Sequence, residues 1–184
     1  MEQSNPGKDV QRRRFTYLKE FVYGGIDGSV TTFAVVAGAT GAKMDAGVII
    51  VLGFANLIAD GFSMSVGNYL SEKSDRAANG KTVGAEPTLS PYRTAGATFI
   101  SFVIMGLIPL LVYVYSYLNG SKGDNLFTYS CFLTGIGFLC IGLLRSRVTQ
   151  TNWVRSVIET LLLGGIAAVL AYYLGFVLER MVSK

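Results

Sequence analysis

The chain has 184 residues, of which 51% are hydrophobic and only 15% are charged, and its formal net charge is +4. Because a soluble domain is usually about 25% charged, this composition favours an integral membrane protein. The absence of histidine, together with only two cysteines, excludes a zinc site of the usual Cys/His type and a Ser-His-Asp catalytic mechanism. We therefore expect a protein that is not an enzyme and that has no permanently bound cofactor.

Five hydrophobic segments are each long enough to cross a bilayer, which takes about 20 apolar residues. In chain order, the sequence predicts a disordered cytoplasmic tail at residues 1–14 and membrane-spanning helices at residues 15–41, 46–70, 93–118, 126–144 and 153–182. A polar cytoplasmic linker at residues 71–92 separates the second span from the third. The predicted fold class is thus an all-α integral membrane protein, in which residues 15–182 form one domain of five transmembrane helices.

Lysine and arginine are distributed unevenly between the two predicted sides of the membrane. The N-terminal tail, the linker with its flank and the turn between the last two spans carry twelve of them, and the other side carries four. Cytoplasmic loops are enriched in Lys and Arg, so we expect the N-terminus in the cytoplasm. The basic run at residues 12–14 precedes the first span, and anionic lipid headgroups explain it more simply than nucleic acid does.

Small residues are spaced four apart at several places within the predicted spans. Such pairs allow two helix backbones to approach closely. They are Gly24 with Gly28, Gly61 with Ser65, and Gly164 with Ala168. Packing within the chain is the simplest explanation, and a dimer seam at one of the pairs is the alternative.

Two aspartates lie inside the first two predicted spans, Asp27 in the first and Asp60 in the second. An aspartate at the centre of a span costs about 2.5–3.5 kcal/mol for insertion. The cations Lys19, Lys73 and Arg93 fall at the ends of predicted spans and not at the depth of the aspartates. Carboxylates without a cationic partner in the bilayer are protonated or face a cation from outside the protein. The sequence therefore indicates transport of an ion, a proton or both.

Further polar side chains lie on the same helix faces as the two aspartates, so each span carries a polar stripe. Residues four apart share a helix face, and the second span follows this spacing with Asn56, Asp60, Met64 and Asn68. In the first span, Glu20, Asp27 and Thr31 also share a face. The alternative for Asn56, Asn68 and Thr31 is that they are buried polar groups that hold helices together.

The donor types restrict the cation that such a site would bind. Oxygen ligands alone suit Mg²⁺, Ca²⁺ or Mn²⁺, whereas the thioether of Met64 favours a softer transition metal such as Fe²⁺. Methionine is also a common packing residue, which is the alternative for Met64. Glu159 in the last span is a secondary candidate, and an ion pair with Arg155 one turn earlier is its simpler explanation.

Several of these segments resemble the vacuolar iron transporter family. The resemblance rests on residues 27–38 (DGSVTTFAVVAG), 59–70 (ADGFSMSVGNYL), 109–111 (PLL) and 159–175. It implies a five-helix protomer, a homodimer with the path at its interface, and proton-coupled export of Fe²⁺ or Mn²⁺ from the cytoplasm. It assigns metal-path roles to Asp27 and Met64, while Asn56 stands where many members have a carboxylate. Many members also have a cytoplasmic metal-binding domain after the second helix, so this chain resembles the short subgroup that lacks it.

We therefore expect a divalent metal transporter whose candidate metal ligands are Asp27, Asp60, Met64, Asn56 and Glu20. Its expected partners are membrane lipids, divalent metal ions, protons and a second copy of the chain. The short loops and the missing signal peptide favour a prokaryotic inner membrane, and a eukaryotic source would imply the vacuolar membrane. The alternatives are a non-transporting membrane scaffold and, less favoured, an intramembrane aspartyl protease, whose usual motifs do not match the sequence around either aspartate.

Overall fold

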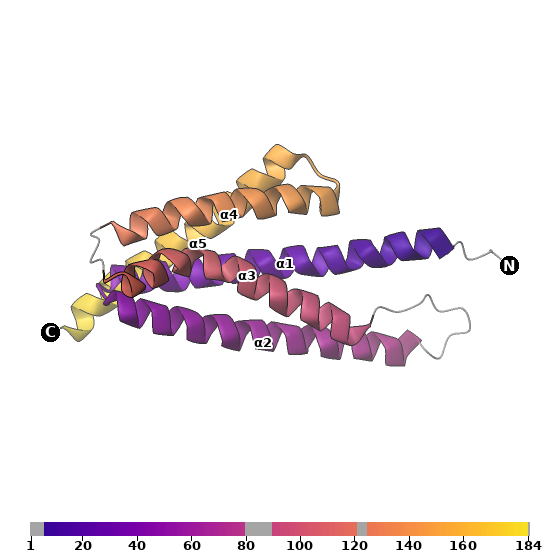
Figure 1. Ribbon diagram of the computed structural model, residues 1–184, viewed down its shortest axis with the longest axis horizontal. Coiled ribbons are helices and arrows are strands. Elements are labelled where there is room, and N and C mark those ends of the chain that lie inside the picture. The colour runs from indigo at the N-terminus through magenta and orange to yellow at the C-terminus, as the bar shows by residue number, and fades with distance from the viewer. Residues whose placement is uncertain (1–5, 80–89, 121–124, 184) are drawn as a thin grey trace.

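The computed structural model describes residues 6–79, 90–120 and 125–183, and these are helical apart from short turns. The five helices are α1 (Pro6–Gly41), α2 (Ala46–Asn79), α3 (Pro91–Leu118), α4 (Leu126–Thr149) and α5 (Trp153–Val182). Each contains a stretch that is long and apolar enough to cross a membrane. The start of α1 and the end of α5 lie at opposite ends of the bundle (Figure 1), as an odd number of spans requires. The predicted all-α fold with five spans is confirmed.

Four helices extend further than the hydrophobic segments predict, α3 by only two residues at its start. α1 begins at Pro6, so residues 6–14 are helical where the sequence predicts a disordered tail. α2 continues to Asn79 instead of ending at residue 70, and α4 continues to Thr149 instead of residue 144. Residues 71–79 contain good helix formers and no glycine or proline, so helix propensity carries α2 through this polar stretch. The rest of the predicted tail and most of the rest of the linker, residues 1–5 and 80–89, lie outside the described residues.

α1 is the central helix and packs against each of the other four (Figure 1). In the most apolar stretch of α1, 50% of the residues are buried inside the bundle, whereas in that of α5 only 17% are. Phe33 and Ala37 join an apolar cluster with residues of α4 and α5, while Val36 and Ala39 join a second cluster with residues of α2 and α3. Within the described part of the chain, α2 and α5 do not pack against each other. One side of α1 is therefore left open between them.

The glycines of α1 allow α3 to approach its backbone closely. A Cβ atom on Gly24 would lie 2.8 Å from the backbone oxygen of Thr98, and one on Gly28 would collide with the backbone of Phe102. The glycines of the other two small-residue pairs face aromatic rings of α3 and α4. The interpretation of these pairs as packing within the chain is confirmed.

Pro109 lies inside α3 and has no N–H to donate to the carbonyl of Met105 one turn earlier. The hydroxyl of Ser29 on α1 donates to that carbonyl at 3.1 Å. From the other side, the hydroxyl of Ser130 on α4 donates to the carbonyl of Pro109 at 2.7 Å. Neighbouring helices thus supply hydrogen bonds around the interruption, which is how a membrane helix tolerates proline.

Candidate metal site

α1 and α2 form a helical hairpin, and the lengths of its arms set which side chains meet. Asp27 lies 14 residues before the end of α1 at Gly41, and Asp60 lies 14 residues after the start of α2 at Ala46. At a rise of about 1.5 Å per residue, each lies ~21 Å from the turn. The two aspartates therefore lie at the same depth in the bundle.

Asp27 and Asp60 lie at the same depth on neighbouring helices, within range of electrostatic repulsion between their carboxylates. Asp27 is exposed on α1, and Asp60 is half-buried on α2. The hydroxyl of Thr31 donates to the backbone oxygen of Asp27, at 2.8 Å, and not to its carboxylate. Among the described residues, neither carboxylate has a hydrogen bond or an ion pair. Like charges within a membrane span are costly, so a cation or a proton from outside the chain is needed to neutralise them.

Asp27 belongs to a strip of α1 that neither α2 nor α5 covers. We define this open strip as Tyr23, Asp27, Thr31 and Val35, which follow one helix face and are all exposed or half-buried. Residues of α5 border the strip near Tyr23, and residues of both α2 and α5 border it near Val35. A cation bound by Asp27 would therefore face the outside of the protomer.

Glu20 and Asn68 form a second polar level, about 10 Å further along the hairpin than the two aspartates. The side-chain amide of Asn68 donates to Glu20 Oε2 at 2.9 Å and to the hydroxyl of Thr98 at 2.7 Å. This contact joins α1, α2 and α3 at the end of the bundle where α1 begins. The spacing in the sequence points to Glu20 as a ligand but not to its pairing with Asn68, which follows from the hairpin register.

Met64 and Asn56 lie one helical turn, about 6 Å, on either side of Asp60 along α2. Both side chains are half-buried. The amide nitrogen of Asn56 is buried without a hydrogen-bond partner among the described residues, which is rare in folded proteins. The structure thus pairs Asn68 with Glu20 on α1, while the roles of Asp60, Met64 and Asn56 as ligands stay predictions.

A single copy of the chain offers few ligands for a divalent cation. In the part of the chain that the structure describes, no three His, Cys, Asp or Glu side chains lie within reach of one metal ion. Two carboxylates and the thioether of Met64 are fewer than the roughly six ligands of an octahedral site. A metal held by Asp27 and Asp60 therefore needs further ligands from water or from a second copy of the chain.

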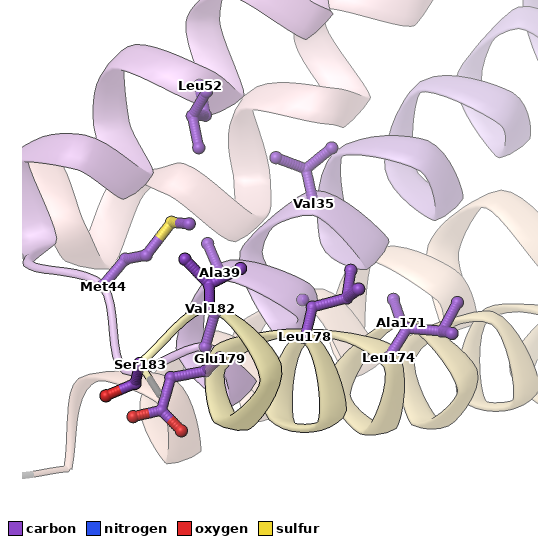
Figure 2. Close-up of a pocket in the computed structure, with 13 residues that line it drawn as sticks. Val35, Ala39, Met44, Leu52, Ala171, Leu174, Leu178, Glu179, Val182 and Ser183 are labelled. Atoms are coloured by element: carbon purple, nitrogen blue, oxygen red, sulfur yellow. The ribbon is translucent and has the colours of Figure 1, made fainter.

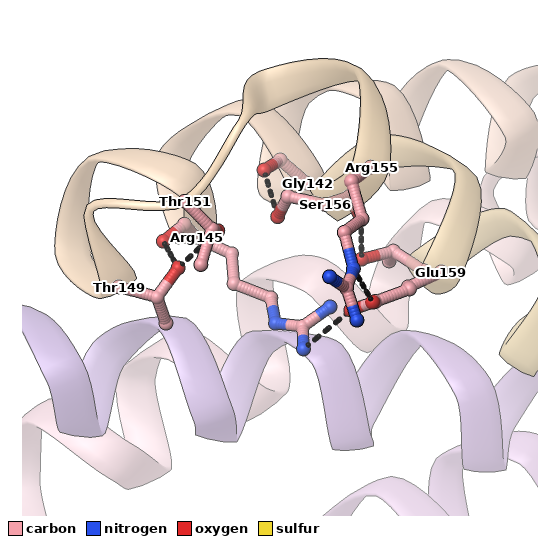
Figure 3. A network of polar contacts seen from close by, with 8 residues as sticks. Gly142, Arg145, Thr149, Thr151, Arg155, Ser156 and Glu159 are labelled. Atoms are coloured by element: carbon pink, nitrogen blue, oxygen red, sulfur yellow. Dashed lines mark hydrogen bonds and ion pairs between the residues drawn. The ribbon is translucent and has the colours of Figure 1, made fainter.

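Glu159, near the start of α5, is engaged by two arginines. Arg155 lies 2.8 Å from one of its carboxylate oxygens, and Arg145 of α4 lies 3.0 Å from the other. Figure 3 shows both guanidinium groups converging on Glu159. The predicted pair with Arg155 is confirmed, and Arg145 adds a contact that spacing along one helix does not reveal. Glu159 ties α4 to α5 and is not free to bind a metal.

Replacing Asn68 by alanine is expected to lower the free energy of unfolding by about 1.5–3 kcal/mol, the usual value of a hydrogen bond to a charged group. Glu20 loses its donor, and three helices lose their common polar contact. Thermal unfolding of the purified protein in detergent measures the change. Asn119→Ala is the matched control, because the exposed Asn119 bonds only to the backbone of its own helix. An equal loss in both variants would contradict the role given to Asn68.

Known proteins resemble this chain over most of its length. The sequence model of the VIT family matches residues 18–88 and 80–176. The chain is 43% identical over 60 residues to a vacuolar iron transporter of Toxoplasma gondii, a match that covers 33% of the chain and 20% of that protein. It is 32% identical over 107 residues to vacuolar iron transporter homolog 1 of Arabidopsis thaliana, covering 54% of each. With the vacuolar iron transporter of Plasmodium falciparum it shares 24% identity over 229 residues, covering 91% of the chain and 84% of that protein.

The chain thus spans only 54% of the Arabidopsis relative and 20% of the Toxoplasma relative. The two stretches matched by the family model nevertheless reach into all five helices and include both Asp27 and Asp60. Relatives named as transporters agree with the expectation of a protein that is not an enzyme. Since the match extends over more than half of its length, from residue 18 to residue 176, the chain belongs to the VIT family.

Proposed function

We propose that this protein transports divalent transition-metal ions, Fe²⁺ or Mn²⁺, across the membrane. The observation that carries the proposal is the pair of Asp27 and Asp60, which lie at one depth in neighbouring spans with no counter-charge among the described residues. Family relatives named vacuolar iron transporters support a metal cargo. Carboxylate oxygens suit Mn²⁺, and the thioether of Met64 adds a preference for the softer Fe²⁺.

The positions of the two polar levels along the hairpin suggest the order in which a transported cation meets them. A cation that enters at the end of the bundle where α1 begins reaches Glu20 first and the two aspartates about 10 Å later. The excess of Lys and Arg at this end supports its assignment to the cytoplasm. The transport direction proposed is therefore out of the cytoplasm.

Protons supply a driving force for release of the metal. Carboxylates must be deprotonated to bind a metal ion, so protons compete with the cation for Asp27 and Asp60. A proton arriving from the opposite side of the membrane displaces the metal, which makes the protein a metal/proton antiporter.

We also propose a homodimer in which the open strip of α1 faces the same strip of a second copy. In a two-fold arrangement each residue of the strip meets its counterpart, so the second Asp27 adds a ligand to the incomplete site of the first. The exposure of Asp27 and the shortage of ligands within one copy support this arrangement. For a eukaryotic source we propose the vacuolar membrane, as the names of the relatives suggest, and these relatives lend no support to a prokaryotic inner membrane.

Proteoliposomes that contain the purified protein are expected to take up Fe²⁺ and Mn²⁺, and to do so faster when a pH gradient drives protons in the opposite direction. Mg²⁺ is the comparison cation, because a hard ion gains nothing from a thioether ligand. Empty liposomes give the background. Flux at the background level, combined with a thermal stability that Mn²⁺ does not change, would favour the alternative of a non-transporting scaffold.

A further inference from the structure

Two cavities open between α1 and α5, and they differ in charge. The first, of about 640 Å³, lies between the end of α1, the start of α2 and the end of α5, and its walls are almost entirely apolar (Figure 2). Glu179 is the one acidic residue among the described residues that line it, and Nζ of Lys43 lies 3.6 Å from its carboxylate. This cavity therefore presents no unbalanced charge to a ligand.

The second cavity, of about 560 Å³, lies toward the end of the bundle where α1 begins. Tyr23 and Ile26 of α1, Arg145 of α4 and one face of α5 between Glu159 and Ile166 line it. We call this cavity the α1/α5 groove. Its volume falls within the range of about 300–1,000 Å³ that is usual for binding sites of small molecules.

The polarity of the α1/α5 groove changes along its length. Glu159 and Arg145 lie at the end nearer to the start of α5, whereas the apolar side chains of Leu162, Leu163 and Ile166 follow further along the helix. Ile166 lies ~10 Å beyond Glu159, near the middle of the span. The groove is thus charged toward the membrane surface and apolar toward the membrane centre, which is the polarity of a phospholipid headgroup and its acyl chain.

Positive charge exceeds negative charge at the polar end of the groove. Glu159 is held by Arg155 at 2.8 Å and by Arg145 at 3.0 Å, so one carboxylate balances only one of two guanidinium groups (Figure 3). Each guanidinium group has five N–H donors, and even a two-pronged contact with Glu159 leaves three of them for another acceptor. The ammonium of Lys19 lies 5.9 Å from the centre of the Tyr23 ring and adds a further positive charge.

We propose that the α1/α5 groove binds one anionic phospholipid, whose phosphate accepts hydrogen bonds from Arg145 and Arg155 and whose acyl chain lies along Leu162, Leu163 and Ile166. The guanidinium fork matches the geometry of a phosphate, and Glu159 holds the two forks at one place. Basic pockets between membrane helices bind anionic headgroups. The excess of Lys and Arg at this end of the bundle favours the cytoplasmic leaflet, which is the one that carries anionic lipids.

Native mass spectrometry of the full chain in detergent tests the proposal, with phosphatidylglycerol or phosphatidylcholine of the same acyl chains as the added lipid. The first phosphatidylglycerol is expected to bind about fivefold more tightly than the first phosphatidylcholine, the contribution of one Lys or Arg near an anionic surface. Arg155→Gln is expected to remove this preference, and its exposed side chain makes a folding defect unexpected. Arg180→Gln is the matched control, because Arg180 lies at the other end of α5 over the ring of Phe176.

A second pair of variants tests the apolar part of the groove. Leu163→Trp places an indole ring in the space proposed for the acyl chain, and we expect it to lose the preference for phosphatidylglycerol. Leu163 is exposed, so the larger side chain does not disturb the core. Leu170→Trp is the control, because Leu170 is exposed two turns further along α5 and does not line the groove. Wild-type lipid binding is expected of it.

Three results would overturn the proposal. One is equal affinity of the wild-type protein for the two lipids, or an unchanged preference in Arg155→Gln. Another is a shift from dimer to monomer in Leu163→Trp with unchanged lipid binding, which would assign the groove to a second copy of the chain. The third is a rise in unfolding temperature with inorganic phosphate equal to that with phosphatidylglycerol, which would assign the arginines to a free anion. None of these measurements requires metal transport, so they decide on the lipid site independently of the proposed function.

Discussion

Replacing Asp27 by asparagine is expected to lower metal transport by at least about 100-fold, since even the groups that support a metal ligand are worth 10–100-fold in affinity. Asparagine keeps the shape of the side chain and removes its charge. The Asp27 carboxylate makes no hydrogen bond or ion pair within the described chain, so the fold is expected to survive. Uptake of Mn²⁺ by proteoliposomes measures the transport rate, and thermal unfolding in detergent measures the fold.

Asp45→Asn is the control for this experiment. Asp45 is an exposed residue in the turn before α2, and asparagine is as good as aspartate at the start of a helix. We expect this variant to transport at the wild-type rate and Asp60→Asn to lose activity together with Asp27→Asn. Wild-type transport by Asp27→Asn and Asp60→Asn would exclude the pair as the metal site.

Replacing Gly28 by alanine is expected to destabilise the protein by about 2–3 kcal/mol, at the upper end of the usual cost of overpacking. The added Cβ would collide with the backbone of Phe102 on α3, and a backbone cannot move aside as the end of a flexible side chain can. The loss therefore exceeds the ~1 kcal/mol that alanine returns through its higher helix propensity. The unfolding temperature of the purified protein is the measurement.

Gly67→Ala provides the matched substitution on α2. A Cβ at Gly67 meets no atom within 4 Å, so only the gain in helix propensity is expected and the unfolding temperature should stay the same or rise. Equal unfolding temperatures for the two variants would show that α1 and α3 are not as closely packed as the structure has them.

The number and order of the helices could be predicted from the hydrophobic segments alone. A backbone in lipid must satisfy its own hydrogen bonds, so each long apolar segment becomes a helix. The ends of α1 and α2 could not be predicted in this way, because a helix outside the bilayer continues according to local propensity and not to hydrophobicity. Residues 6–14 and 71–79 are accordingly helical beyond the predicted spans.

The polar residues also divide into those that the sequence identifies and those whose partners only the structure shows. Asp27 and Asp60 stand out in the sequence because a charge inside an apolar segment is rare and costly. Glu159 has the same chemistry in the sequence, but Arg145 of α4 neutralises it together with Arg155. The spacing of residues along one helix does not reveal a contact with another helix. Only the structure could therefore show that Glu159, unlike the two aspartates, is neutralised.

By itself, the sequence determined that this is a five-span membrane protein with two aspartates that no neighbour along the chain neutralises, since both are properties of single segments. Only the tertiary structure decided which polar residues meet. The register of the hairpin places Asp27 and Asp60 at one depth and sets Glu20 beside Asn68, and the separation of α2 from α5 leaves Asp27 on an open strip of α1. These features depend on how closely helices far apart in the chain approach one another, and it is side-chain volume at the contacts, as at Gly28, that sets this approach.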